Sequence, residues 1–93
     1  MKEKNKNLVL VIVSGPDQPG ITAELMKCIM NSEASIEDMG QSITHGFLSL
    51  SILLNISNAP EDSPLLKDLL FKAKKMKMDL EFEILEENYE IHN

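Results

Sequence analysis

The chain has 93 residues and a formal net charge of −6, with nine lysines and no arginine among its basic residues. An acidic chain without the bidentate guanidinium group is a poor binder of phosphates and bases, so we expect no nucleic-acid partner and no anionic membrane surface. No run approaches the roughly 20 apolar residues of a membrane span, and residues 8–13 are too few for the hydrophobic region of a signal peptide. We therefore expect one small cytoplasmic domain, with its single cysteine, Cys28, reduced.

The first expected element is a strand over residues 8–13, whose unbroken aliphatic run predicts a central strand buried on both faces. A helix is expected to begin at Ile21. Its apolar positions recur at helical spacing: Ile21, Leu25, Cys28 and Ile29, widened by Met26 and Met30.

The segment Gly15-Pro16-Asp17-Gln18-Pro19-Gly20 joins this strand to the helix. Glycines permit a sharp turn and close approach, prolines stiffen the turn, and Asp17 can accept hydrogen bonds from the first helical N–H groups. Such a corner is able to hold an anion, for example the carboxylate of a small metabolite. The simpler interpretation is that Asp17 caps the helix and nothing binds there.

Residues 34–45 predict a bent edge strand, because Ile36 has one parity and Met39 and Ile43 have the other. A bulge near residues 38–40 would absorb the extra residue. The pair His45-Gly46 then predicts a tight turn into a strand over residues 47–56. The expected inner face of that strand consists of Leu48, Leu50, Ile52, Leu54 and Ile56.

A second helix is expected after Ser63-Pro64, which matches an N-cap followed by proline at the first helical position. Lysines crowd its last turns, where cations favour the negative end of the helix, and a solvated surface accounts for them. Residues 79–87 predict a half-exposed edge strand with an acidic side. The expected inward residues are Leu66, Leu69, Leu70, Ala73 and Met76 on the helix, and Leu80, Phe82 and Ile84 on the strand.

These elements predict an α+β fold: a ferredoxin-like βαββαβ plait, with a four-stranded antiparallel sheet and two helices on one face. The first and third strands would lie in the middle of the sheet. Because residues 8–13 are apolar on both faces, we expect the open face or an edge to meet another domain or a second copy of the chain.

The same plait hosts many functions, so the site residues must decide between them. The central strands carry too few aromatic residues for RNA binding, and the loop after the first strand has neither paired cysteines for a metal nor the Lys and Ser or Thr of a P-loop. His45 and His92 are far apart in the sequence and are not expected near Cys28. We therefore predict no catalytic residue, no metal and no cofactor in this chain.

The apolar first strand, followed by Gly-Pro-Asp-Gln-Pro-Gly-Ile-Thr at the start of a helix, resembles the ACT domain, a small-molecule-sensing module of enzymes in amino-acid metabolism. Residues 36–43 and the segment His45-Gly46-Phe47-Leu48-Ser49-Leu50 are similar to the N-terminal ACT region of bacterial phosphoserine phosphatases. The resemblance covers residues 7–58 closely and the second half by element order.

The resemblance implies that a small amino acid, with serine favoured, binds where the loop after the first strand meets a neighbouring ACT unit. The loop positions that would receive its carboxylate and amino group are Asp17, Gln18, Pro19, Gly20 and Ile21. Asp38, Gly40 and Gln41 would line the adjoining strand edge or contribute to a dimer contact. Two other interpretations stay open: Gly40 only permits the bulge, and Gln41 only satisfies an edge backbone group.

A phosphoserine phosphatase also has a catalytic domain with an Asp-x-Asp-x-Thr or Asp-x-Asp-x-Ser motif, and the 93 residues contain no such motif. We therefore expect residues 1–93 to be a single ACT domain, with a core over about residues 7–87, that is a fragment without its phosphatase domain and is not itself an enzyme. It would sense an amino acid as a homodimer and regulate serine biosynthesis. The alternative is a free-standing ACT or dimerisation module that binds no ligand by itself.

Overall fold

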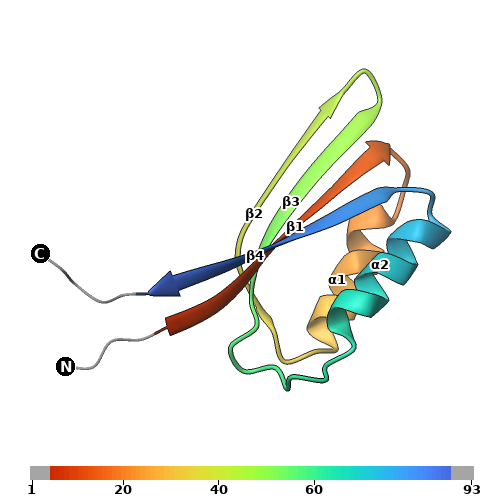
Figure 1. Ribbon diagram of the computed structural model, residues 1–93. Coiled ribbons are helices and arrows are strands. Elements are labelled where there is room, and N and C mark those ends of the chain that lie inside the picture. Colours follow the sequence, from red (N-terminus) through yellow and green to blue (C-terminus); the bar gives the residue numbers. More distant parts are fainter. Residues whose placement is uncertain (1–4, 89–93) are drawn as a thin grey trace, which may run out of the picture.

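The computed structural model describes residues 5–88 of the chain, which form four strands and two helices (Figure 1). The elements in chain order are β1 (Asn5–Pro16), α1 (Ile21–Met30), β2 (Ser35–Thr44), β3 (Phe47–Asn55), α2 (Leu65–Lys75) and β4 (Asp79–Asn88). All three strand pairs are antiparallel, and the strand order is β2-β3-β1-β4. The predicted ferredoxin-like plait, with the first and third strands in the middle, is confirmed.

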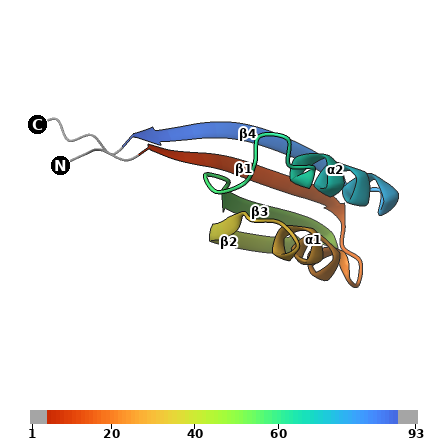
Figure 2. The same cartoon turned by 90° about the horizontal axis from the view of Figure 1, so that it is seen from below.

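Both helices lie on one side of the sheet, and the other side is free of helices (Figure 2). Since side chains alternate along a strand, the residues of β1 and β3 divide between these two sides. Odd-numbered β1 residues and even-numbered β3 residues face the helices. The core cluster that they form with the two helices includes Val9, Val11, Val13, Leu48, Leu50, Ile52, Leu54, Leu25 and Leu69.

The open side of β1 is less buried than the sequence predicted. Leu8 is buried, but Leu10 and Ile12 are only half-buried. The prediction that residues 8–13 are buried on both faces is therefore wrong for the chain taken alone, because no helix covers the second face. The expectation that this face meets another surface stays a prediction.

The buried stripe differs from the prediction at Met30 in α1 and at Leu65 and Leu70 in α2. In α1, Ile21, Leu25 and Ile29 are buried as expected, but Met30 is 78% exposed because it lies on the side of the helix away from the core. In α2 the buried residues are Leu65, Leu69 and Ala73, whereas Leu70 is 41% exposed. The reason is the start of α2: Pro64 occupies the N-cap, so the inward stripe at i, i+4 and i+8 begins at Leu65.

The two edge strands also depart from simple alternation. In β2 the register shifts between Ile36 and Asp38, which confirms a bulge at the beginning of the predicted region. In β4, Ile84 pairs with Val9 on the helix side yet is 68% exposed, because the helix layer does not extend over this part of the edge. Its prediction as an inward residue is wrong, while Leu80 and Phe82 pack against the core.

Candidate ligand-binding site

The predicted binding corner follows β1 directly, and it lies at the same end of the sheet as the turn between β2 and β3. The turn residues His45 and Gly46 have φ values of 51° and 74°, which confirms the tight turn predicted there. The backbone N–H of Asp17 donates to the carbonyl of Gly46 at 2.8 Å. This hydrogen bond fastens the loop to the hairpin, so Gly46 adjoins the candidate site although the sequence analysis did not place it there.

Asp17 does not cap α1. The N-cap residue is Gly20, and no side chain forms a capping hydrogen bond at this end of the helix. The Asp17 side chain is exposed. The helix-cap interpretation of the loop is therefore wrong, and the first intrahelical bond runs from the N–H of Glu24 to the carbonyl of Gly20 at 2.9 Å.

Gly20 has a left-handed backbone, with φ 87° and ψ −4°. A β-branched residue such as valine would be strained in this conformation, because its Cβ atom is crowded by the backbone at positive φ. A Cβ atom added at Gly20 would meet nothing within 4 Å. Space in front of the helix start is consequently open within the chain.

Gly15, the first glycine of the loop, serves a different purpose. Its φ is 152°, and an added Cβ would lie 2.7 Å from the sulfur of Met78. At Gly15 the absent side chain therefore leaves room for Met78 of the same chain, and not for a ligand. Of the two glycines in the loop, Gly20 is the one that leaves its approach free for another molecule.

Gln18 fastens the loop to the connection between α2 and β4. Its side-chain amide donates to the carbonyl of Met76 at 2.9 Å and is 3.5 Å from the sulfur of Met78. Pro19 is exposed, whereas the side chain of Ile21 is buried in the core. Of the five loop positions, Gln18 and Ile21 thus have structural side-chain roles, and Ile21 offers a ligand only its backbone.

The three predicted residues of β2 do not share one face. Asp38 and Gly40 pair with Leu53 and Ser51, which places them on the open side of the sheet. Gln41 pairs with the buried Leu50 and so lies on the helix side. Within one chain these residues are not gathered around the loop, and all three are exposed on an edge strand that a neighbouring molecule could reach.

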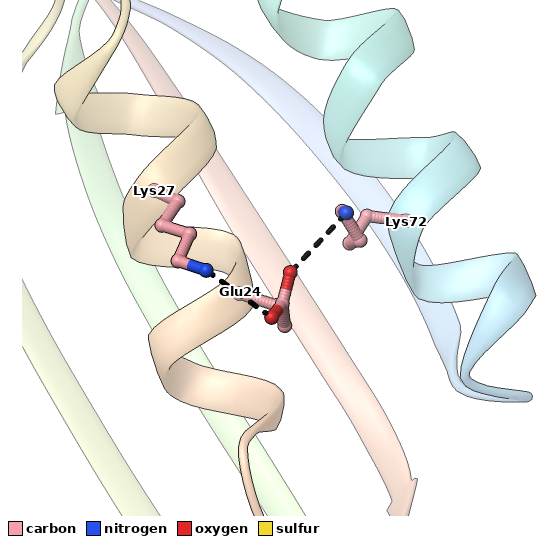
Figure 3. A network of polar contacts seen from close by, with 3 residues as sticks. All are labelled: Glu24, Lys27 and Lys72. Carbon is pink, nitrogen blue, oxygen red and sulfur yellow. Dashed lines mark ion pairs between the residues drawn. The ribbon is translucent and has the colours of Figure 1, made fainter.

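A hollow of about 700 Å³ lies in the groove between α1 and α2. There the carboxylate of Glu24 lies 3.2 Å from the ammonium of Lys72 and 3.6 Å from that of Lys27, so one anion joins the two helices (Figure 3). The hydrogen bond from Lys72, and then the charge of Lys27, lowers the pKa of Glu24. Burial raises the pKa of the neighbouring Cys28 thiol.

Within the described part of the chain, no group of three or more His, Cys, Asp or Glu side chains is placed to hold a metal ion. Neither α1 nor α2 is long and apolar enough to cross a membrane. The sequence analysis missed the contacts of the loop with Met76 and Met78. No local sequence pattern predicts these contacts, because they depend on where the end of α2 lies relative to β1.

The ACT domain family model matches residues 7–83 of the chain. The UPF0237 protein MJ1558 of Methanocaldococcus jannaschii is 38% identical over 65 residues, which are 70% of this chain and 72% of that protein. The chain also resembles the solved structure of an ACT domain protein from Streptococcus pneumoniae, with a TM-score of 0.67, 14% identity, and coverage of 85% of this chain and 89% of that one.

A further similar structure is a putative glycine cleavage system transcriptional repressor, with a TM-score of 0.66, 19% identity, and coverage of 87% of this chain and 46% of that one. The chain spans less than half the length of this and other solved structures that it matches. At such identities the structural likeness shows the fold alone. The family match over residues 7–83 and the shared plait establish that the chain belongs to the ACT domain family.

Proposed function

We propose that this ACT domain is a regulatory module that binds a small amino acid, serine first, at the start of α1. The observation that carries the proposal is the uncapped helix start behind Gly20. No side chain caps α1, and the approach to Gly20 is open within the chain. The N–H groups of Ile21, Thr22 and Ala23 precede the first intrahelical bond and are available in principle to a ligand carboxylate.

The helix dipole adds to this preference. Unpaired N–H groups and the positive end of the dipole favour an anion at a helix N-terminus. A free amino acid has few atoms from which to gain binding energy, so we expect a dissociation constant in the roughly micromolar to millimolar range. Such an affinity suits a sensor of a metabolite pool.

The site is proposed to be complete only in a homodimer. The exposed strand β2 carries Ile36, Met39 and Ile43 on its helix side, and none of the three is buried within the chain. Met30 on α1 is a further exposed apolar side chain, and it does not line the groove between α1 and α2. Pairing of β2 with a second copy would bury these side chains and bring another edge strand, with its Asp38, Gly40 and Gln41, toward the loop.

At a finer level, we propose that this ACT domain regulates a cytoplasmic phosphoserine phosphatase, in which amino-acid binding is relayed through the dimer contact to a catalytic domain. The support is the pair of sequence segments at residues 36–43 and 45–50. None of the relatives named above is a phosphoserine phosphatase. The link to phosphoserine phosphatase is therefore supported only by these two sequence segments. Hydrolysis tests the prediction that this chain is a regulatory domain and not itself the enzyme. The chain by itself should release no phosphate from phosphoserine. Turnover proportional to its concentration, with contaminants excluded, would contradict that prediction.

The second candidate is a dimerisation module that binds no ligand by itself. It is favoured by the hydrogen bond from Gln18 to Met76, which takes one polar side chain of the loop, and by the exposed apolar edge of β2. Nuclear magnetic resonance decides between the two. Titration of the ¹⁵N-labelled protein with L-serine should shift the amide signals of residues 17–23.

The matched variants are Gly20→Asn and Glu33→Asn. Asparagine tolerates the positive φ of Gly20, where an added Cβ meets nothing within 4 Å, and Glu33 is exposed beyond the other end of α1. Gly20→Asn should weaken serine binding by placing a side chain in front of the N–H groups, while Glu33→Asn should leave it unchanged. If no shifts occur at millimolar serine, or if they occur away from residues 17–23, the dimerisation module remains as the function.

A further inference from the structure

The open side of the sheet is an apolar surface with an acidic border. The strand registers place Leu10, Leu53 and Ile12 at its centre, and all three are half-buried although no helix of the chain covers them. Along β4, the exposed residues Asp79, Glu81 and Glu83 flank this centre. Among residues 7–85, the strand positions on this side include no lysine.

The outward side of α2 has the opposite character. Phe71 is 64% exposed and Leu70 is 41% exposed, at positions that point away from the buried stripe of the helix. A hollow of about 400 Å³ lies over them, and its border consists of Lys67 and Lys74 together with one acidic residue, Asp68. The ammonium of Lys75 lies 5.7 Å from the centre of the Phe71 ring.

The charge around α2 contrasts with that of the whole chain. Between positions 67 and 77 there are five lysines and one aspartate, in a protein of net charge −6. A lysine-rich helix end needs no partner for its stability, but lysines around an exposed phenylalanine form an apolar patch with a basic border. The basic border of this patch is complementary in charge to the acidic border of the open sheet side. The helix α2 and the open side lie on opposite sides of the sheet (Figure 2).

We propose that the outward side of α2 docks on the open sheet side of a second copy of this chain. Phe71 and Leu70 would contact the apolar surface around Leu10 and Ile12, which no helix of the same chain covers. Lys67 and Lys74 would lie opposite the carboxylates of β4. The contact joins two different surfaces, so it is head-to-tail and does not close at two copies.

This contact is distinct from the dimer proposed above, which uses β2 on both chains. Two other partners for α2 are less favoured by the charges. A chain of net charge −6 without arginine is repelled by nucleic acid and by anionic membranes, and one aromatic side chain gives little area for insertion into lipid. Docking of the basic-bordered α2 patch on the acidic-bordered sheet side requires neither nucleic acid nor a membrane.

The test is association measured by sedimentation equilibrium at low ionic strength, from micromolar to millimolar protein. The average mass of the wild type should keep rising beyond two copies, and sodium chloride should reduce it. A helix variant, Lys67→Glu with Lys74→Glu, and a sheet variant, Glu81→Lys with Glu83→Lys, should each weaken association by at least about tenfold. All four side chains are exposed, so the fold should tolerate the changes.

The decisive sample is an equal mixture of the two variants. Each variant alone presents like charges on both surfaces, whereas in the mixture an acidic helix meets a basic sheet and a basic helix meets an acidic sheet. Association should therefore return in the mixture. The control, Glu33→Lys with Glu61→Lys, makes the same change in net charge at exposed positions away from both surfaces and should not reproduce the effect of the sheet variant.

Phe71→Ser should weaken association at high salt as well as at low salt, because it removes apolar area and leaves the charge unchanged. Four outcomes would overturn the proposal: no association of the wild type, a mass that stops at two copies with both variants unaffected, a mixture that does not recover, or binding to anionic vesicles that Phe71→Ser abolishes. The last outcome would assign this surface to a membrane. None of the four depends on whether serine binds at the start of α1.

Discussion

The two sides of the central strands differ in what covers them, although the same backbone forms both. On the helix side, Val9, Val11 and Val13 are completely buried. On the open side, Leu10 and Ile12, which alternate with them, are half-buried. The difference shows that an aliphatic sequence sets the propensity for a central strand, whereas burial depends on which side the crossover helices take.

The largest contrast should come from two leucines of β3 that lie three residues apart. Leu50→Ala removes a side chain with no solvent exposure from the core and should lower the free energy of unfolding by about 2–5 kcal/mol. Leu53→Ala acts on the half-buried open side and should cost about 1 kcal/mol in the monomer. Urea unfolding at low micromolar concentration measures both; equal losses would mean that the open side is covered in solution.

The sequence predicted the plait because each element carries its own signal. The alternation of Leu48, Leu50, Ile52 and Leu54 fixes the inner face of β3, and that face is confirmed. Leu70 and Ile84 could not be placed, because their exposure depends on where α2 begins and how far the helix layer extends over β4.

The candidate site was predictable only in part. The Gly-rich loop before α1 is a local signal, and it does lie at a helix start. The conformation of Gly20 and the hydrogen bond from Gln18 to Met76 are tertiary details that no pattern in the loop specifies. The glutamine is separated from its acceptor by 58 positions, so its partner emerges only from the packing of α2 against the sheet.

Substitution of two glycines, one in contact with Met78 and one on the open side of the sheet, extends the comparison of the two sides. Gly15→Ala would place a methyl group 2.7 Å from the Met78 sulfur, at a φ of 152° that side chains rarely adopt, and should cost about 1–3 kcal/mol. Gly40→Ala on the open side meets nothing within 4 Å and should leave stability unchanged or raise it by about 0.5–1 kcal/mol. Thermal unfolding of the two variants side by side tests this; destabilisation by Gly40→Ala similar to that by Gly15→Ala would contradict it.

At the rim of the covered side, Gln18→Ala removes the hydrogen bond that joins the loop to the end of α2. We expect a loss of about 0.5–1.5 kcal/mol, the usual contribution of such a bond. Asp17→Ala is the matched control, because its exposed side chain caps nothing, and it should change stability by less than about 0.5 kcal/mol. A larger effect from Asp17→Ala would show that its carboxylate has a structural contact in solution.

The smallest effect should come from the two solvent-facing ion pairs of Glu24, with Lys27 on the same helix and with Lys72 on α2. Glu24 has a lowered pKa, first because Lys72 hydrogen-bonds its carboxylate and then because Lys27 attracts it. A carboxyl group whose pKa is lower in the folded state stabilises the fold above its unfolded pKa, and that contribution is lost as the pH falls through the folded pKa. Since the pair is accessible to water, the effect on stability should be small and should decrease with added salt.

The carboxyl titration of Glu24, followed by nuclear magnetic resonance, measures this directly. Lys72→Met should raise the pKa of Glu24 toward its ordinary value, and Lys27→Met should raise it less, because Lys27 lies farther from the carboxylate, at 3.6 Å against 3.2 Å. An unchanged pKa in Lys72→Met would mean that the contact across the groove does not persist in solution. The helices would then be held together by the buried residues beneath them, Leu25 and Leu69 among them. Burial on the helix side of the sheet would in that case account for the stability, and the comparison of Leu50→Ala with Leu53→Ala measures that contribution.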